Sequence, residues 1–409
     1  MKSPFTPRQR RVIAALVLAY SSAYVCRTNI SMMLPGIMEE LQLSQARAGT
    51  MTTLFAAIYA VGQVVNGLIV DRVNPRLWIF AGLTVSAACN LLCAFAPSFT
   101  LLLVLWSLNA VAQSMLWTPV VRVTAQRFEA EGRSRASFML SFALIFGNLA
   151  AWGVSALLVA RAGWRAAFAC CAAVTFAVAV TTTLMLRGEP NGPAENRPRE
   201  AKQKTAAVSL GQLVLGTGLA MVLFGCLFNG FVRDSVMTWA PTILMETQGI
   251  DLNSVLGVAL IIPVVNFFGV MLGRFCYNKL GRMARRAVAL LMLGCAVASL
   301  ALTLLAGLSP LVCAVLLACC VAMAYGLNPL LTSVLPLEYY GLGRVGTVAG
   351  LVDAFIYLGS SLSGVLTGAL AERTGWQTVF LVWTIGALIG AVAIGVAALP
   401  KFMDKLFKE

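Results

Sequence analysis

Long apolar stretches alternate with short polar connections along the whole chain. A membrane-spanning helix needs about 20 mostly apolar residues, and stretches of this length recur in each half of the sequence. We expect spans near residues 12–36, 50–70, 77–97, 100–125, 138–160, 166–186, 210–240, 252–275, 287–307, 311–335, 346–370 and 377–399. The pattern therefore predicts an all-α membrane protein with twelve transmembrane helices.

One long polar segment interrupts this pattern near the middle of the chain. Residues 188–206 are rich in charged residues and prolines, a composition typical of a flexible linker. We therefore expect an N-terminal six-helix bundle over 1–187 and a C-terminal six-helix bundle over 207–409, which form two pseudo-symmetric halves.

Two short patterns recur in both predicted halves, in the same order. Pro35 follows Arg27 at the same spacing as Pro241 follows Arg233. The second pattern is Arg161-Ala-Gly-Trp164 before Phe168, repeated as Arg373-Thr-Gly-Trp376 before Phe380. Chance can produce one such match, but two matches at nearly one offset indicate an internal repeat, a common feature of transporters.

The composition agrees with a chain that is largely surrounded by lipid. Hydrophobic residues make up 59% of the sequence, charged residues 11%, and the mean hydropathy is +0.85. A soluble domain has about 25% charged residues. We therefore expect a multi-pass protein of the plasma (inner) membrane, surrounded by the lipid bilayer.

The net charge of +14 could suggest a nucleic-acid partner, but the placement of the charges argues against one. Lysines and arginines gather in the connections on one side of the predicted spans, and the other side receives only Arg47, Arg161, Arg165 and Arg373. This bias predicts that both termini and the linker are cytoplasmic. The basic charge marks topology, so we expect no nucleic-acid partner.

Residue usage also narrows the chemistry. The chain has no histidine, and its 11 cysteines lie in apolar runs without a CxxC spacing, as expected of small packing residues. No nucleophile–base pair or metal cluster stands out. We expect no metal, no cofactor and no enzymatic activity, and we expect a monomer.

Two arginines, Arg27 and Arg233, fall inside predicted spans at matching positions of the repeat. A charge at mid-bilayer costs roughly 2.5–3.5 kcal/mol on insertion scales. A pseudo-two-fold axis would bring both arginines to one central cavity. Their planar guanidinium groups suit the oxygens of a phosphate or carboxylate, so we expect them to bind a small-molecule anion.

The alternative is that each arginine is neutralised by an acid. Asp234 adjoins Arg233, but adjacent residues point about 100° apart around a helix, so we expect a poor partner. Asp353, in the eleventh predicted span, can neutralise at most one arginine. It could instead carry a coupling proton, and the sequence leaves both roles open. Tyr20 and Tyr24 share the helical face of Arg27 and could donate hydroxyl groups to the same anion.

The loop after the second span, Gly67-Leu-Ile-Val-Asp71-Arg72-Val-Asn-Pro-Arg76, resembles the signature of the major facilitator superfamily. The resemblance implies that Asp71, Arg72 and Arg76 latch the cytoplasmic helix ends in one state of an alternating-access cycle. The alternative is that these residues form no latch and only belong to the positive charge expected of a cytoplasmic loop.

Three further segments resemble the organophosphate:phosphate antiporter family. They are Tyr20-Ser-Ser-Ala-Tyr24-Val-Cys-Arg27-Thr-Asn29 with Pro35, Arg233 with Trp239-Ala-Pro241-Thr, and Leu105-Trp-Ser-Leu-Asn109-Ala-Val-Ala-Gln113 with Trp117-Thr-Pro119. The resemblance implies transport of a phosphorylated metabolite, often in exchange for inorganic phosphate. It assigns phosphate binding to Arg27 and Arg233, and substrate contacts to Tyr20, Tyr24, Trp117, Asn148, Tyr325 and Tyr357.

The chain departs from this family at two places. Gln63 stands where many members have a lysine, and the fifth span lacks a histidine that some members carry near Phe146. These differences imply a weaker positive field and a substrate with less negative charge or fewer contacts. We include Gln63 among the candidate binding residues. A proton-coupled symporter of carboxylates or other organic anions, and a membrane sensor of a phosphorylated metabolite, are the alternative functions.

Overall fold

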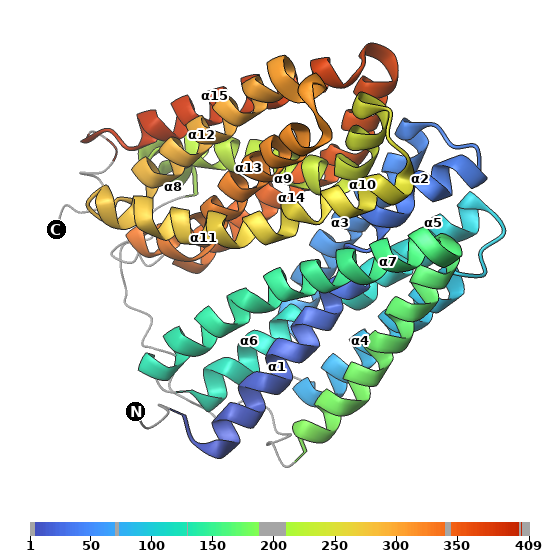
Figure 1. Cartoon of the computed structure of the whole chain (residues 1–409). Helices are drawn as coiled ribbons and strands as arrows, with labels where there is room; N and C mark the ends of the chain where they lie inside the picture. Colours follow the sequence, from blue (N-terminus) through green and yellow to red (C-terminus); the bar gives the residue numbers. More distant parts are fainter. Residues whose placement is uncertain are drawn as a thin grey trace. The chain divides into compact units, whose positions relative to one another are not determined.

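The computed structural model describes residues 5–69, 73–128, 130–187, 210–339, 345–400 and 402. The predicted linker at 188–206 and two of the predicted latch residues, Asp71 and Arg72, lie outside these ranges. The described residues form helices and short connections, with no β-strand among them. The all-helical fold expected from the apolar pattern is confirmed (Figure 1).

The chain divides into two compact units, Met1–Leu43 with Leu54–Arg197, and Ser44–Thr53 with Pro198–Glu409. The helices of the first half are α1 (Pro7–Val25), α2 (Ile30–Glu40), α3 (Gln45–Ile69), α4 (Pro75–Cys93), α5 (Phe99–Ser114), α6 (Trp117–Arg127) and α7 (Ala130–Met185). Within the first unit α7 packs along both α1 and α4, and α4 packs against α5.

The second half contains a matching set of helices. They are α8 (Leu210–Gly216), α9 (Leu219–Gln248), α10 (Leu252–Ala259), α11 (Ile261–Lys279), α12 (Ala284–Leu305), α13 (Pro310–Pro329), α14 (Val345–Thr374) and α15 (Trp376–Ala397). Short 3-10 turns, η2 (Ala306–Leu308) and η4 (Leu335–Tyr339), and a π-helical turn, η3 (Leu330–Val334), flank α13. The main packing pairs are α9 with α14, α11 with α13, and α12 with α15.

Ten helical segments of the described chain are long and apolar enough to cross a membrane. One of them, Phe142–Met185, has 44 residues, about twice the length of one span. It bends at Gly163, where φ is +80°. The 25-residue helix α3 is not among the ten, although it is long enough to span. With the bend and α3 included, every predicted span has a helix.

The glycines of the repeated Arg-x-Gly-Trp pattern have the same backbone conformation. Gly163 has φ +80° and ψ 173°, and Gly375, which precedes α15, has φ +81° and ψ 168°. A side chain at such a φ is strained, so glycine is the residue that allows the chain to turn there. The repeat read from the sequence therefore marks the same turn in each half.

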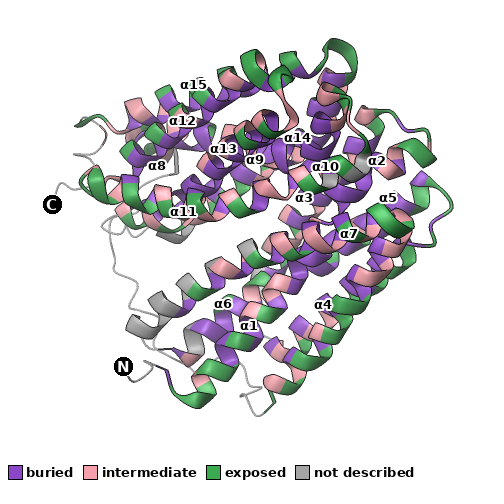
Figure 2. Cartoon of the chain, viewed as in Figure 1, coloured by how far each residue is buried: buried purple, intermediate pink, exposed green. Residues whose placement is uncertain are grey.

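Figure 2 shows which residues of each unit are buried and which are exposed. Buried residues lie where helices meet, while many large apolar side chains are exposed, among them Phe95, Leu215, Phe268, Leu304 and Val392. Exposed apolar surface on this scale suits helices that face lipid. The second unit also shows very close helix contact, because a Cβ atom on Gly359 of α14 would lie 1.9 Å from the carbonyl oxygen of Leu227 on α9.

Candidate anion-binding site

Arg27 lies in a break between α1 and α2. The α-helix ends at Val25, and α2 begins at Ile30, so the first predicted span is interrupted where its charged residue lies. The break frees backbone carbonyl groups that the continuing helix would otherwise bond. Asn109 Nδ2 donates to the Cys26 carbonyl oxygen at 2.8 Å. The break is therefore stabilised by side chains, as irregular backbone at membrane depth requires.

A network of buried amide and hydroxyl groups surrounds this break. Asn90 Nδ2 donates to the Cys26 carbonyl at 3.2 Å, and Gln113 Nε2 donates to the Ala23 carbonyl at 2.9 Å. The network is completed by bonds from Asn29 Nδ2 to Asn90 Oδ1 (2.9 Å), from Ser86 Oγ to Asn109 Oδ1 (2.6 Å) and from Gln113 Nε2 to Ser86 Oγ (2.8 Å). These five side chains are at most 2% exposed. The network fixes the backbone that carries Arg27.

Aromatic rings surround the guanidinium group of Arg27. Its Cζ atom lies 4.2 Å from the ring centre of Tyr59, 5.5 Å from that of Phe55 and 5.6 Å from that of Tyr24. The face of an aromatic ring attracts a cation. Gln63 Nε2 donates a hydrogen bond to the Tyr59 hydroxyl, so this predicted binding residue reaches Arg27 through Tyr59.

The predicted aromatic residues of the first half form one cluster. The hydroxyl groups of Tyr20 and Tyr24 lie 3.4 Å apart, and the Trp117 ring centre is 4.8 Å from that of Tyr20. Asn148 is buried, and its Oδ1 atom accepts no hydrogen bond from a described residue. A Cβ atom on the neighbouring Gly147 would lie 2.7 Å from the Tyr24 Cβ, which places this turn of α7 against the cluster.

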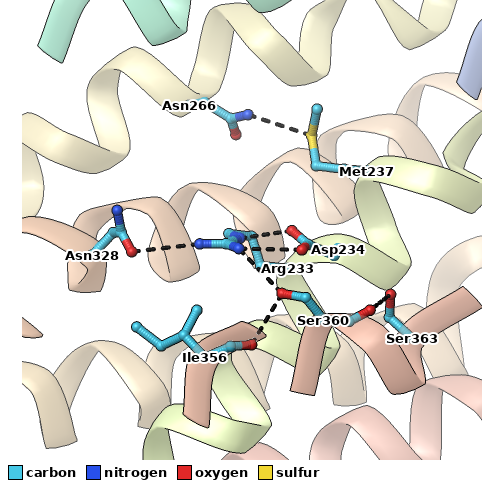
Figure 3. A network of polar contacts seen from close by, with 8 residues as sticks. All are labelled: Arg233, Asp234, Met237, Asn266, Asn328, Ile356, Ser360 and Ser363. Atoms are coloured by element: carbon cyan, nitrogen blue, oxygen red, sulfur yellow. Dashed lines mark hydrogen bonds and ion pairs between the residues drawn. The ribbon is translucent and has the colours of Figure 1, made fainter. Parts of the chain in front are cut away.

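Arg233 lies within the continuous helix α9 and binds the acid next to it (Figure 3). Its Nε atom lies 2.7 Å from Asp234 Oδ1, and its Nη2 atom lies 3.2 Å from Asp234 Oδ2. The expectation that Asp234 is a poor partner was wrong. That expectation followed the direction of the Cβ atoms, whereas the long arginine side chain bends back and presents its guanidinium edge to both carboxylate oxygens.

Two further helices contribute polar groups to Arg233. Nη1 donates to Asn328 Oδ1 of α13 at 3.4 Å, and Nη2 donates to Ser360 Oγ of α14 at 3.3 Å. The Ser360 hydroxyl in turn donates to the Ile356 carbonyl at 3.0 Å, as Figure 3 shows. The second unit thus holds its arginine with a carboxylate, an amide and a hydroxyl group.

The other predicted residues of the second half lie around this group with different degrees of contact. The Tyr325 ring centre is 6.0 Å from the Arg233 Cζ atom. Tyr357 lies one helical turn before Ser360 on α14, on the same side of the helix. Asp353 is exposed and forms no ion pair within 4 Å to a described residue. The acid paired with Arg233 in this structure is therefore Asp234.

The predicted latch is only partly described. Arg76 is the second residue of α4 and half-buried, and the Asn74 side chain accepts a hydrogen bond from its backbone N–H at 3.0 Å. Arg122 of α6 donates from Nη1 to the Val73 carbonyl at 2.8 Å, which ties α6 to the start of α4. The latch role of Arg76 stays a prediction.

Sequence reasoning missed several residues that contact the two arginines or stabilise the backbone break beside Arg27. In the first unit these are Phe55, Tyr59, Ser86 and Asn90, and in the second unit Asn328 and Ser360. Spacing offered a hint, because Phe55 and Tyr59, like Ser86 and Asn90, are four residues apart and share a helix face. No cluster of metal-binding side chains occurs among the described residues.

A family model for the Major Facilitator Superfamily matches residues 16–364. The chain belongs to the Major Facilitator Superfamily. This assignment confirms the resemblance read from the sequence, and it makes the protein a multi-pass membrane protein of a transporter fold and not an enzyme.

Related members of the superfamily align over nearly the whole chain. A glycerol-3-phosphate transporter of Bacillus subtilis (strain 168) is 25% identical over 96% of this chain and 93% of its own length. The membrane sensor protein UhpC of Escherichia coli (strain K12) is 24% identical over 94% and 91%. A probable sulfoacetate transporter of Cupriavidus necator is 25% identical over 94% and 92%.

A solved structure has the same fold. The inward-facing, unoccupied crystal structure of a bacterial homologue of the human lysosomal transporter spinster matches with a TM-score of 0.76. The alignment covers 98% of each chain at 19% identity. The similarity supports the superfamily fold of this chain.

Proposed function

We propose that this protein transports a phosphorylated or related organic anion, in exchange for inorganic phosphate, by alternating access. The observation that carries the proposal is the pair Arg27 and Arg233, equivalent residues of the repeat that both lie in apolar helical segments. A buried guanidinium group is expensive in a membrane, and it suits the oxygens of a phosphate, sulfonate or carboxylate.

The surroundings of the two arginines support this role in different ways. In the first unit, the rings of Tyr24, Phe55 and Tyr59 surround the guanidinium group of Arg27, at 4.2 to 5.6 Å from its Cζ atom. In the second unit, polar groups from α9, α13 and α14 converge on Arg233. We propose Tyr20, Gln63, Trp117, Asn148, Tyr325 and Tyr357 as further substrate contacts, with both termini cytoplasmic.

The names of the relatives point to the same chemical class of ligand. Glycerol 3-phosphate and sulfoacetate, named for two of them, each combine a small carbon chain with a tetrahedral anionic group. A membrane sensor is the second candidate function, because one similar protein carries that name. Proton-coupled anion symport is the third, because Asp353 of α14 is an acid within an apolar helical segment and is not the acid paired with Arg233.

Transport in reconstituted liposomes separates these functions. Liposomes loaded with inorganic phosphate should take up labelled glycerol 3-phosphate, sugar phosphates or a carboxylate control in the presence of the protein. We expect uptake to require internal phosphate and to be lost in Arg27→Lys and in Arg233→Lys, since lysine cannot bind two oxygens with a planar fork. Uptake driven only by a pH gradient would favour symport, and binding without flux would favour the sensor.

A further inference from the structure

Asp234 occupies the edge of Arg233 that an anionic ligand would use. The two groups meet at two points, Nε with Oδ1 at 2.7 Å and Nη2 with Oδ2 at 3.2 Å. This is the fork-to-carboxylate geometry by which arginine also binds phosphate. The Arg233 side chain is 12% exposed and that of Asp234 is 31% exposed, so the pair is only partly screened by solvent.

Few donors of Arg233 remain for a ligand while this pair is formed. A guanidinium group has five N–H hydrogens. Asp234 takes two of them, and Asn328 and Ser360 accept from two others at the longer distances of 3.4 and 3.3 Å. A ligand that takes a two-point hold on Arg233 must therefore displace Asp234 or replace the weaker bonds.

The carboxylate also changes which ligands are favoured. Asp234 and Arg233 together carry no net charge. The pair therefore does not attract a doubly charged ligand more strongly than a singly charged one. An anionic group bound to Arg233 lies within a few ångströms of the Asp234 carboxylate, and the repulsion between them grows in proportion to the ligand's charge. A doubly charged group is therefore repelled about twice as strongly as a singly charged group of the same shape.

We propose that Asp234 is a specificity-determining residue that favours singly charged anions, such as sulfonates, sulfate esters or carboxylates, over doubly charged phosphate esters. The inference rests on the proposed function, because it assumes that Arg233 contacts the transported anion. The arginine pair alone suits phosphates, sulfonates and carboxylates, and this inference selects the singly charged members of that group.

Isosteric pairs of esters provide a direct test. Methyl sulfate and methyl phosphate, glycerol 3-sulfate and glycerol 3-phosphate, and glucose 6-sulfate and glucose 6-phosphate have matched shapes. At pH 7.5 each sulfate ester carries one negative charge, while each phosphate ester is mostly doubly charged because its second pKa is about 6. Dissociation constants are measured for each pair with the purified full-length protein by titration calorimetry.

We expect the wild type to bind at least one sulfate ester more tightly than its phosphate partner. Asp234→Asn should shift the ratio of the two dissociation constants about tenfold towards the phosphate ester, the size expected for removing one partly screened charge. Asp234→Glu keeps the charge and should keep the wild-type preference. Asp251→Asn is the matched control, because Asp251 is an exposed acid of the same half that lies beyond the end of α9 at Gln248, which is itself about 21 Å along the helix from Asp234. This variant should leave the ratio unchanged.

The outcomes separate the two proposals. A ratio that is the same in wild type and in folded Asp234→Asn, or a wild type that prefers phosphate esters throughout, overturns the inference about Asp234 alone. If no ester of any pair binds the wild type, or if Arg233→Gln binds as the wild type does, the proposed anion site at Arg233 is wrong and the inference falls with it.

Discussion

The two halves place an arginine at equivalent positions but hold it differently. Arg27 lies in a backbone break and is surrounded by aromatic rings, whereas Arg233 lies in a continuous helix and binds a carboxylate. The repeat therefore fixes where the charge lies in the sequence of helices. It does not fix which groups stabilise that charge, and the two environments give the arginines different capacities for a ligand.

A second difference explains the first. The twelfth residue of α4 is Ser86 and that of α12 is Cys295, while the eleventh residue of α5 is Asn109 and that of α13 is Cys320. The first unit thus has amide and hydroxyl groups where the second has thiols, which are weak donors. The interrupted helix α1 has free carbonyls that need strong donors, whereas α9 continues as a helix through the equivalent residues around Arg233. At these two matched positions, the amide and hydroxyl groups belong to the half whose helix is broken.

The largest loss of stability should come from replacing Arg285, the second residue of α12. Its counterpart in the first half is Arg76, the second residue of α4. Arg285 is fully buried, and it donates to Glu338 Oε2 (2.9 Å), the Thr217 carbonyl (2.9 Å), the Ala397 carbonyl (2.7 Å) and the Tyr339 hydroxyl (2.8 Å). Arg285→Ala leaves the carboxylate of Glu338, whose side chain is only 11% exposed, without its cation. We expect a loss of about 3–5 kcal/mol in the free energy of unfolding, measured by chemical or thermal unfolding in detergent.

Arg76→Ala is the matched control for this measurement. Arg76 is also the second residue of its helix but is only half-buried, and its Nε atom has no described hydrogen-bond partner. We expect its replacement to change stability by less than about 1 kcal/mol. Equal losses for the two variants would show that the buried bonds of Arg285 do not set the stability of the second half.

A smaller loss should follow from removing one amide at the break in α1. Asn109→Ala leaves the Cys26 carbonyl with one donor fewer and removes the acceptor of Ser86. We expect a loss of about 1–3 kcal/mol, together with weaker anion binding because the backbone of Arg27 is less well fixed. Thermal unfolding and titration of glycerol 3-phosphate measure the two effects.

Cys320→Ala is the control at the equivalent position of the second half. The Cys320 thiol makes two weak contacts, 3.4 Å from the Ser299 hydroxyl and 4.0 Å from the Cys295 carbonyl oxygen, and neither is to α9. We expect a smaller loss than for Asn109→Ala and no change in anion binding. A loss from Cys320→Ala as large as that from Asn109→Ala would contradict the link between amide groups and the broken helix.

These comparisons show how far the sequence predicts the molecule. The twelve spans follow from hydropathy, because a bilayer imposes a minimum apolar length on each helix. The repeat located Arg27 and Arg233 in the same way as Gly163 and Gly375. Few other residues can replace an arginine that binds an anion within a span, or a glycine at a positive φ. The fold and the position of the charged residues could therefore be predicted.

The partners of the two arginines could not be predicted in the same way. Asp234 was set aside because adjacent residues diverge around a helix, yet the arginine side chain is long enough to reach it. Tyr59 and Asn90 belong to other helices, and they reach Arg27 and the neighbouring Cys26 carbonyl only after the bundle has packed. Contacts that depend on side-chain rotamers and on packing between helices are not visible in spacing along one helix.

The smallest effect concerns the glutamate that lies 13 residues after each arginine, at the end of α2 in the first half and near the end of α9 in the second. In both halves the tryptophan of the repeated pattern donates from Nε1 to this glutamate, Trp164 to Glu40 and Trp376 to Glu246, each at 2.8 Å. The first half adds an ion pair between Glu40 and Arg165. The second half has Gln377 at the position of Arg165, and Glu246 instead accepts from Gln45 Nε2, at 2.6 and 2.7 Å.

This difference predicts a contrast in salt dependence more than in stability. The Glu40 and Arg165 side chains are 47% and 38% exposed, and exposed ion pairs contribute about 0.2–1 kcal/mol and weaken as salt rises. Glu40→Gln should therefore lower the unfolding temperature slightly at low salt and hardly at all in 1 M NaCl. Glu246→Gln keeps a carbonyl acceptor for Trp376 and Gln45 and has no arginine to lose, so its effect should be equally small at both salt concentrations. A salt-dependent loss for Glu246→Gln that matches the loss for Glu40→Gln would mean that Gln45 does not replace the arginine as the partner of this glutamate, and that the two halves are more alike at this point than their contacts indicate.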